Sequence, residues 1–409
     1  MFRMGCNGIM KKNEKLLLFG RWSSKIGDIL FDYVNNIVIV SAFTNSSWVL
    51  ALYQSSQTIV NILFNIIGGA IADQGKRKRI IVIADLLSAV ICFVTSFFIE
   101  SSYMAIALIF ANALLAAVFS FSSPTFKAIV RDVIEKNRIN VFNSISNAGA
   151  ELIAMIGPAA GAALLGIVGP RGALLINAVT FLISALSECF LVPNRAEETG
   201  RRESKEGVLK SIILGLQYLL KEKTILYLVI LSAVVNFFLA GYNLAVPYTN
   251  NIYSGTFDNF YSKAIILEAV GGILGSFINS KLPDKFTQNY KVLVILLLLT
   301  GVSLALVPLS GPTENLVLCL LPFLLFGGFL TMYNINFMTL VQVSVDDHFL
   351  GRVFSVIFTV AVMFMPVGSF VFSFLNVTDN MWGFLFAGAG IMAAAILSSF
   401  CLCLAKPIE

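Results

Sequence analysis

Twelve apolar runs, each long enough to cross a lipid bilayer, take up most of this 409-residue sequence. A hydrocarbon core about 30 Å thick requires roughly 20 consecutive apolar residues in a helix. Membrane-spanning strands would be about ten residues long and would alternate in polarity, so the runs predict helices. We therefore expect an all-α integral membrane protein with twelve transmembrane helices. The predicted spans are 16–42, 47–72, 80–99, 103–123, 143–168, 173–192, 225–247, 261–280, 291–310, 315–341, 353–375 and 382–405.

The distribution of lysine and arginine orients these spans, because basic residues accumulate in the cytoplasmic loops of membrane proteins. With the N-terminus inside the cell, 24 of the 28 Lys and Arg residues fall on cytoplasmic segments. Only Arg171 and Lys263 fall on the outer side. Both termini are expected in the cytoplasm, and the positive charge reports topology rather than binding to nucleic acid. The first apolar run continues into a full span, so we expect no cleaved signal peptide.

A polar segment near the middle of the chain divides the spans six plus six. Residues 193–206 read PNRAEETGRRESKE. We expect two six-helix halves, at 1–192 and 225–409, joined by a cytoplasmic linker over 193–224. Residues 207–223 of that linker predict either an interfacial helix or an early start of the seventh span. A Val-Phe pair opens a span both at 141–142 and at 353–354, as expected for two parallel six-helix pseudo-repeats.

Several functional classes are excluded by what the sequence lacks. It has one histidine, His348, and no HExxH motif, so we expect no metal centre. It has no GxxxxGK[ST] phosphate loop, which argues against an ATP-driven pump. Since no histidine-based or nucleophilic constellation occurs either, we expect neither an enzyme nor a cofactor.

The segment that follows the second span reads GAIADQGKRKR from Gly69. A glycine followed four residues later by Asp73 and then by a basic cluster resembles the motif between helices 2 and 3 of the major facilitator superfamily. Gly69 would permit close helix approach, Asp73 would face the positive end of a helix, and Arg77 would pair with an acid across a cytoplasmic gate. Gln74 and Lys76 depart from the family pattern. The alternative is a basic cluster that only fixes orientation.

Other stretches resemble the macrolide-efflux group of drug:proton antiporters in this superfamily, which also contains siderophore exporters. In the fifth span, Gly157, Pro158 and Gly161 resemble an antiporter motif in which proline and glycines allow a bend. An ordinary kinked helix is the alternative. The other matching stretches are Gly27-Asp28, Ala84-Asp85, Ser123-Pro124 through Asp132, and 350–354.

Acidic residues inside predicted spans are expected to carry function, because an ionised side chain at the bilayer centre costs at least about 2.5 to 3.5 kcal/mol. Asp28 lies roughly 18 Å into the first span at about 1.5 Å per residue, and Asp32 lies one turn farther on the same face. Two such carboxylates raise each other's proton affinity, which suits proton handling. A structural ion pair between Lys25 and Asp28 is the alternative.

Glu268 is the only acid deep in the second half and is the other candidate for binding a proton or the substrate. It lies beside a small-residue surface that includes Gly271 and Gly275, so a hydrogen-bonded packing role is the alternative. We assign Asp85 and Glu188, near the cytoplasmic ends of their spans, to gating or structure. Glu151 could pair with the gate cluster, and Arg352 is placed with that gate.

Uncharged polar residues recur inside the spans and predict a water-filled cavity, with hydrogen bonding between helices as the alternative. They are Gln54, Gln57, Asn61, Asn65, Asn236, Asn243, Asn334 and Asn336.

Together these features predict a proton-coupled secondary exporter in which two halves expose a central site alternately to each side of the membrane. Protonation of Asp28, Asp32 or Glu268 would favour the return step. The resemblance implies export of amphipathic drugs such as macrolides, and hence antibiotic resistance. The alternatives are export of an endogenous metabolite or siderophore, and a non-transporting membrane sensor. We expect a monomer in the bacterial cytoplasmic membrane, with a small molecule, protons and lipid as partners.

Overall fold

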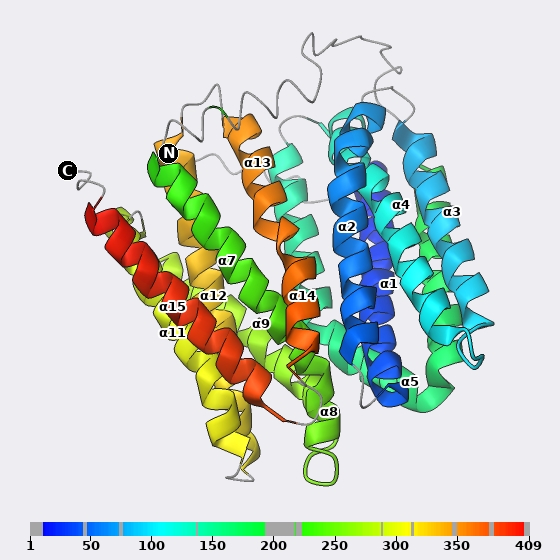
Figure 1. Cartoon of the computed structure of the whole chain (residues 1–409). Helices are drawn as coiled ribbons and strands as arrows, with labels where there is room; N and C mark the ends of the chain where they lie inside the picture. The colour runs from blue at the N-terminus through cyan, green and yellow to red at the C-terminus, as the bar shows by residue number, and fades with distance from the viewer. Residues whose placement is uncertain are drawn as a thin grey trace.

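The computed structural model consists of helices and their connections, and no strand occurs among the residues that it describes (Figure 1). Those residues are 11–43, 47–72, 77–135, 138–192, 217, 223–287, 289–311, 315–345, 350–375 and 380–404. The helices are α1 Lys12–Ala42, α2 Ser47–Ala72, α3 Arg77–Ser96, α4 Met104–Val133, α5 Ile139–Cys189, α7 Lys223–Ala245, η2 Val246–Tyr248, α8 Thr249–Ile252, α9 Phe260–Asn279, α10 Asp284–Thr287, α11 Tyr290–Ser310, α12 Leu316–Ser344, α13 Leu350–Met363, α14 Met365–Ser373 and α15 Trp382–Leu404. Most of the predicted linker, where an interfacial helix or an early start of the seventh span was expected, lies outside the described residues.

Eight segments of the described chain are long and apolar enough to cross a membrane. Their outward faces carry large apolar side chains, of which Phe110, Leu186 and Leu397 are each more than 60% exposed. Contiguous apolar surface of this kind is costly in water and favourable against lipid. The segments are 77–96, 104–123, 145–189, 226–252, 260–279, 290–310, 316–341 and 382–399.

Helix α5 has 51 residues and reverses direction at Gly169, whose φ of 68° and ψ of 178° are not helical. A glycine tolerates this positive φ because it has no Cβ. Before the reversal, Gly157 faces Ile29 and Gly161 faces Tyr33 of α1, so this limb runs parallel to α1. After the reversal, Asn177 lies beside Gly27 and Ser184 lies beside Gly20, so this limb runs antiparallel to α1. Two antiparallel limbs, 139–168 and 170–189, therefore both pack on α1.

The helices pack as two groups that face each other (Figure 1). In the first group α1 packs on α5, α2 on α4, and α3 on α4 and α5. In the second group α9 packs on α12, α11 on α12 and α15, and α7 on α14 and α15. The groups meet where α5 contacts α9 and where α2 contacts α13 and α14.

The two ends of the bundle differ in their contacts. At the end where α1 and α3 begin, called the basic end here, the ion pairs lie within the first group and include that of Arg77 with Asp132. Toward the opposite end, side chains join the two groups. There the Ser47 hydroxyl donates to the Ser373 carbonyl at 2.9 Å, and the Gln54 amide donates to the Asn243 carbonyl at 3.0 Å.

Two predicted boundaries are wrong. Residues 124–133, predicted as loop, continue α4 to Val133. Apolar side chains near the end of α4, including Ile129, pack with Leu17 and Leu18, which extends the helix beyond the apolar run. The span predicted at 353–375 is two helices, α13 and α14, and Pro366 lies at the start of the second. Proline lacks the N–H that an unbroken helix requires.

Candidate functional site

A cavity of about 360 Å³ lies among α1, α3, α4 and α5, and we call it the first cavity. Its charged lining residues come from three of these helices. Ser122, Ser123 and Phe126 of α4 add polar and aromatic surface without charge. An apolar bundle interior would exclude this many ionisable groups unless they served one another or a ligand. The charged residues are Arg21, Lys25, Asp28, Asp85 and Glu188.

Asp28 faces the first cavity, where the charges of Lys25, Asp32, Asp85 and Arg21 act on it. It is half-buried, as is Asp32 one turn farther along α1. The ion pair of Lys25 with Asp28, considered as an alternative from the sequence, is not among the ion pairs of the described residues. Among the described residues, Asp28 therefore faces the first cavity without an ion pair.

Asp85 and Glu188 line the same cavity but are more deeply buried, with 8% and 4% of their surface exposed. The Ser24 hydroxyl donates to Oδ1 of Asp85 over a long 3.4 Å. Oδ2 of Asp85 and Oε2 of Glu188 have no hydrogen-bond partner. Both acids therefore line the same cavity as Asp28.

A larger cavity of about 930 Å³, the second cavity, lies among α7, α9 and α12. Glu268 faces it and accepts a hydrogen bond from the buried Tyr242 hydroxyl. Asn243 and Asn334 are among its lining residues. Its wall also contains Ala154 of α5, a residue that lines the first cavity as well. The two cavities therefore meet at α5.

Close contact between α9 and α12 fixes the position of Glu268. A Cβ added to Gly271 would lie 1.9 Å from the Leu324 carbonyl oxygen, and one added to Gly327 would lie 2.0 Å from the Glu268 carbonyl oxygen. Only residues without a Cβ allow backbones to approach this closely. The tight packing expected beside Glu268 is therefore present.

The polar side chains of α2 make the helix-to-helix hydrogen bonds that were considered as the alternative to a cavity lining. Gln54 donates to the Asn243 carbonyl at 3.0 Å, and Asn61 accepts from the Ser120 hydroxyl at 3.1 Å. Gln57 is half-buried. The side chain of Asn65 lies outside the described residues.

Two predicted cavity-lining residues have other surroundings. Asn336 is fully buried, because it lies 200° around α12 from Asn334 at 100° per residue, and it faces packed helices. Its amide atoms have no hydrogen-bond partner. Asn236 donates to the Ser232 carbonyl of its own helix at 2.9 Å.

Two buried tyrosines stack on each other between the two groups of helices, and the sequence interpretation did not single them out. Tyr33 of α1 stacks on Tyr261 of α9, with ring centroids 5.1 Å apart and planes 2° from parallel. The charges of Asp32 and Glu268 both act on Tyr261. The sequence could have indicated these tyrosines through their positions near candidate acids, since Tyr33 follows Asp32 directly and Tyr261 precedes Glu268 by two helical turns.

The family model described as Major Facilitator Superfamily matches residues 17–369, a range that includes both cavities. The chain belongs to the Major Facilitator Superfamily. It is accordingly a multi-pass membrane transporter of a small molecule and not an enzyme.

Relatives of this transporter are similar over most of their length. It is 20% identical to macrolide efflux protein A of Streptococcus pyogenes over 399 residues, which cover 94% of this chain and 96% of that protein. It is 22% identical to multidrug efflux pump Tap of Mycolicibacterium fortuitum over 328 residues, 76% of each chain. A crystal structure of nucleoside transporter NupG covers 95% of this chain and 98% of its own, with a TM-score of 0.76 and 13% identity. The structural match confirms the helical transporter fold.

The predicted gate of this superfamily member is described only in part. Nη1 of Arg77, at the start of α3, donates to both carboxylate oxygens of Asp132 near the end of α4, and both N–O distances are 2.9 Å. This acid belongs to the same group of helices as Arg77. Asp73 lies outside the described residues, as do the surroundings of Gly69 and the side chains of Glu151 and Arg352.

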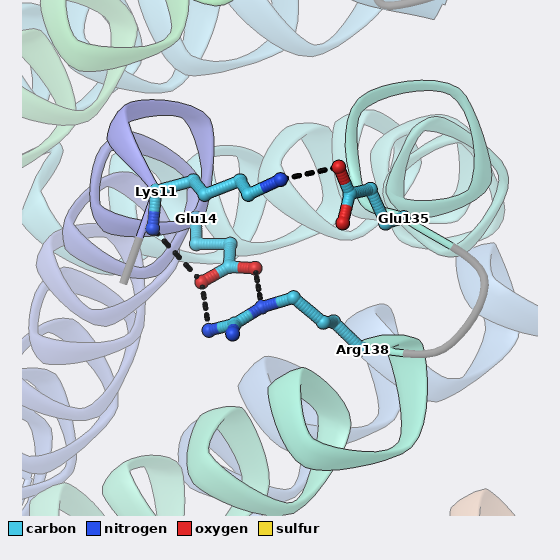
Figure 2. A network of polar contacts seen from close by, with 4 residues as sticks. All are labelled: Lys11, Glu14, Glu135 and Arg138. Carbon is cyan, nitrogen blue, oxygen red and sulfur yellow. Dashed lines mark hydrogen bonds and ion pairs between the residues drawn. The ribbon is translucent and has the colours of Figure 1, made fainter. Parts of the chain in front are cut away.

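A second polar network at the basic end ties the start of α1 to the connection between α4 and α5 (Figure 2). Arg138 donates to both carboxylate oxygens of Glu14, Lys11 donates its backbone N–H to Glu14, and the Lys11 ammonium pairs with Glu135. Burial alone would raise the pKa of Glu14, but the hydrogen bonds and charges of Arg138 and Lys11 lower it below the ordinary 4.5. Glu14 is therefore a buried carboxylate held in its ionised form.

The predicted bend in the fifth span has no non-helical dihedral angle at Gly157, Pro158 or Gly161, since the only one within α5 is at Gly169. The glycines instead allow close packing on α1. A Cβ on Gly157 would lie 2.3 Å from Ile29, and one on Gly161 would lie 2.6 Å from Tyr33.

Within the described chain, no group of three or more His, Cys, Asp or Glu residues could hold a metal ion.

Proposed function

We propose that this transporter is a proton-coupled exporter of amphipathic small molecules, macrolides among them. The observation that carries the proposal is the pair of cavities, each with an acid in a low-dielectric setting, that meet at Ala154 between the two groups of helices. Protonation of Asp28 or Glu268 neutralises a charge that faces a cavity inside the bundle, and this gives a proton gradient a means of biasing one conformation over another.

The proposed topology has twelve spans in two six-helix halves, with both termini in the cytoplasm. Two features support it. Helix α5 supplies two antiparallel limbs, and the pair α13 and α14 supplies one further crossing. The basic end carries the Lys and Arg residues that are expected on the cytoplasmic side, including Arg77 and Arg138. We further propose that the protein acts as a monomer in a bacterial cytoplasmic membrane.

In the proposed cycle the halves rock about the contact between α5 and α9. The stack of Tyr33 on Tyr261 and the bonds from Ser47 and Gln54 join the halves toward the outer end. This arrangement suits a state in which the cavities open toward the cytoplasm. Release of the outer contacts, with the Arg77 to Asp132 region closing against the second half, would expose the same site outward.

The second cavity is the proposed chamber for the substrate. Its volume lies within the range of about 300 to 1,000 Å³ that is usual for drug-sized ligands. Ile265, Phe277 and Leu330 offer apolar contact, while Asn243, Asn334 and Glu268 offer polar anchors. An amphipathic molecule needs both kinds of surface. The two relatives named as efflux proteins, one of them for macrolides, are consistent with this substrate class.

The test is substrate uptake into inside-out proteoliposomes that contain the purified protein, with and without an imposed proton gradient. We expect macrolide accumulation only with the gradient, and we expect Asp28→Asn to abolish the dependence on it. Gradient-driven uptake that is unchanged in Asp28→Asn would remove Asp28 from the mechanism. Accumulation independent of the gradient in the wild type would overturn proton coupling altogether.

A further inference from the structure

Two acids of the first cavity, Asp85 and Glu188, have no role in the proposed cycle. They are nevertheless the most deeply buried of the charged residues that line this cavity. Neither takes part in an ion pair among the described residues. The positive charges of the basic residues in the cavity, Arg21 and Lys25, act on the carboxyl group of Asp28. The charge that acts on Glu188 is that of Asp85.

The hydrogen-bond donors near this pair do not satisfy it. Ser24 reaches Oδ1 of Asp85 at 3.4 Å, whereas the Ser184 hydroxyl donates to the Gly20 carbonyl at 2.8 Å. One carboxylate oxygen of each acid, Oδ2 of Asp85 and Oε2 of Glu188, has no partner. A buried carboxylate left unpartnered in this way is costly in its ionised form.

The position of Glu188 adds to this cost. It is the second-last residue of α5, where the partial negative charge of the helix C-terminus disfavours an anion. Its Cγ packs against α1, 3.2 Å from where a Cβ on Gly20 would lie. Glu188 therefore has little freedom to turn toward water or toward a basic side chain.

Glu14 provides the contrast within the same group of helices. It is equally buried, with 3% of its surface exposed, but Arg138 binds both of its oxygens. The chain therefore neutralises one buried acid with an arginine and leaves the other two facing a cavity without one. Since two interacting carboxylates in a low dielectric cannot both ionise readily, a proton is the natural third partner.

We propose that Asp85 and Glu188 hold one proton between them and form a proton-binding site in the first cavity, distinct from Asp28 and from Glu268. The titratable or charged groups that face it are Asp28, Lys25 and Arg21 from α1, while the described lining from α4 is uncharged. The Arg21 guanidinium lies over the Phe126 ring, 4.5 Å from its centroid, and so is directed to α4. Either carboxyl can carry the proton, and its release leaves two carboxylates that need water from the cavity.

The first test uses dicyclohexylcarbodiimide, which reacts with protonated carboxyl groups in apolar surroundings. The carboxyl oxygen bonds to the carbodiimide carbon and its proton passes to nitrogen, so no other reactant is consumed. With the wild-type transporter in lipid nanodiscs near neutral pH, we expect one label per molecule on this pair, located by mass spectrometry on Asp85 or Glu188 but not on both. Glu14, equally buried and ion-paired, is expected to stay unlabelled.

Label on neither residue would overturn the proposal, and label on both in one molecule would show two independent protons and overturn the shared one. Protection by Na⁺ at fixed pH would identify a metal-cation site instead. As a second readout, the infrared band of protonated carboxyl groups should lose the intensity of one carboxyl in the double variant Asp85→Asn/Glu188→Gln and none in Glu14→Gln. An unchanged band in the double variant would contradict the site.

Neither readout needs a transported substrate. Failure of macrolide transport with intact labelling would overturn the proposed function and leave this site standing. Intact macrolide transport without labelling would overturn the proton-binding site and leave the proposed function standing.

Discussion

The two cavities of this transporter differ in charge and in size. The first is small and has three acids and two basic residues on its walls, whereas the second is more than twice as large and has a single acid, Glu268, among apolar and amide side chains. Dense charge suits the binding and release of protons, and a roomy, mixed surface suits an amphipathic substrate. The contrast supports the proposal that the two groups of helices divide the work, with Glu268 coupling protons to transport from the proposed substrate chamber.

Glu268→Gln is the sharpest test of that division and should have the largest effect. An amide cannot take up or release a proton, so gradient-driven uptake should fall about a hundredfold, equivalent to about 2.7 kcal/mol. Exchange of substrate without a gradient should continue, because the cavity keeps its shape. Glu100→Gln, which neutralises an exposed glutamate, is the matched control. Gradient-driven uptake that survives in Glu268→Gln would place coupling in the first cavity alone.

Gly271→Ala tests whether the second cavity depends on the close approach of α9 to α12. The new methyl group would lie 1.9 Å from the Leu324 carbonyl oxygen, so the helices must separate. Overpacking of this kind costs about 2 kcal/mol, which thermal unfolding in detergent should detect as a lower Tm. Gly166→Ala is the control, since its Cβ meets nothing within 4 Å. An equal Tm for both variants would contradict the tight contact.

A bulky side chain placed in each cavity should separate their roles. Ser276→Phe narrows the second cavity and should raise the KM for uptake roughly fivefold, equivalent to about 1 kcal/mol. Ser122→Phe fills part of the first cavity and should leave KM unchanged while it alters the pH dependence of uptake. The reverse pattern would exchange the roles of the cavities.

The smallest effect concerns Glu14, whose lowered pKa stabilises the fold above pH 4.5. That stabilisation is lost as the pH falls below 4.5 through the lowered value, because the carboxylate must then be protonated. The Tm of the wild type should exceed that of Glu14→Gln at neutral pH, and the difference should shrink on acidification. A difference that stays constant with pH would show that the ion pair with Arg138 contributes nothing through its charge.

Much of the fold could be predicted because apolar length is a direct consequence of the bilayer. Helix α9 spans 260–279 where 261–280 was predicted, and α2 matches 47–72. The end of α4 was missed because a helix can continue past its apolar run when other side chains pack on it, as Ile129 does with Leu17. The break between α13 and α14 was missed because proline is tolerated within many membrane helices.

The candidate site was less predictable, since it depends on how each helix is rotated about its axis. Asn334 and Asn336 look alike in the sequence, yet only the first faces a cavity. Tyr33 and Tyr261 were counted with the apolar residues, so their stack between the two groups gave no polar signal. Asp28 and Glu268 stood out because a charge within an apolar run needs no knowledge of rotation to be noticed.

The single-residue reversal at Gly169 has a mechanical consequence. Because no loop separates them, the two limbs of α5 are expected to move together. One limb carries Ala154, which lines both cavities, and the other carries Glu188 one residue before its end. A shift of α9 that presses on the first limb must also displace the second. Entry of a substrate into the second cavity would thus shift Glu188 through the backbone of α5, without any change in the charge of the residues in between.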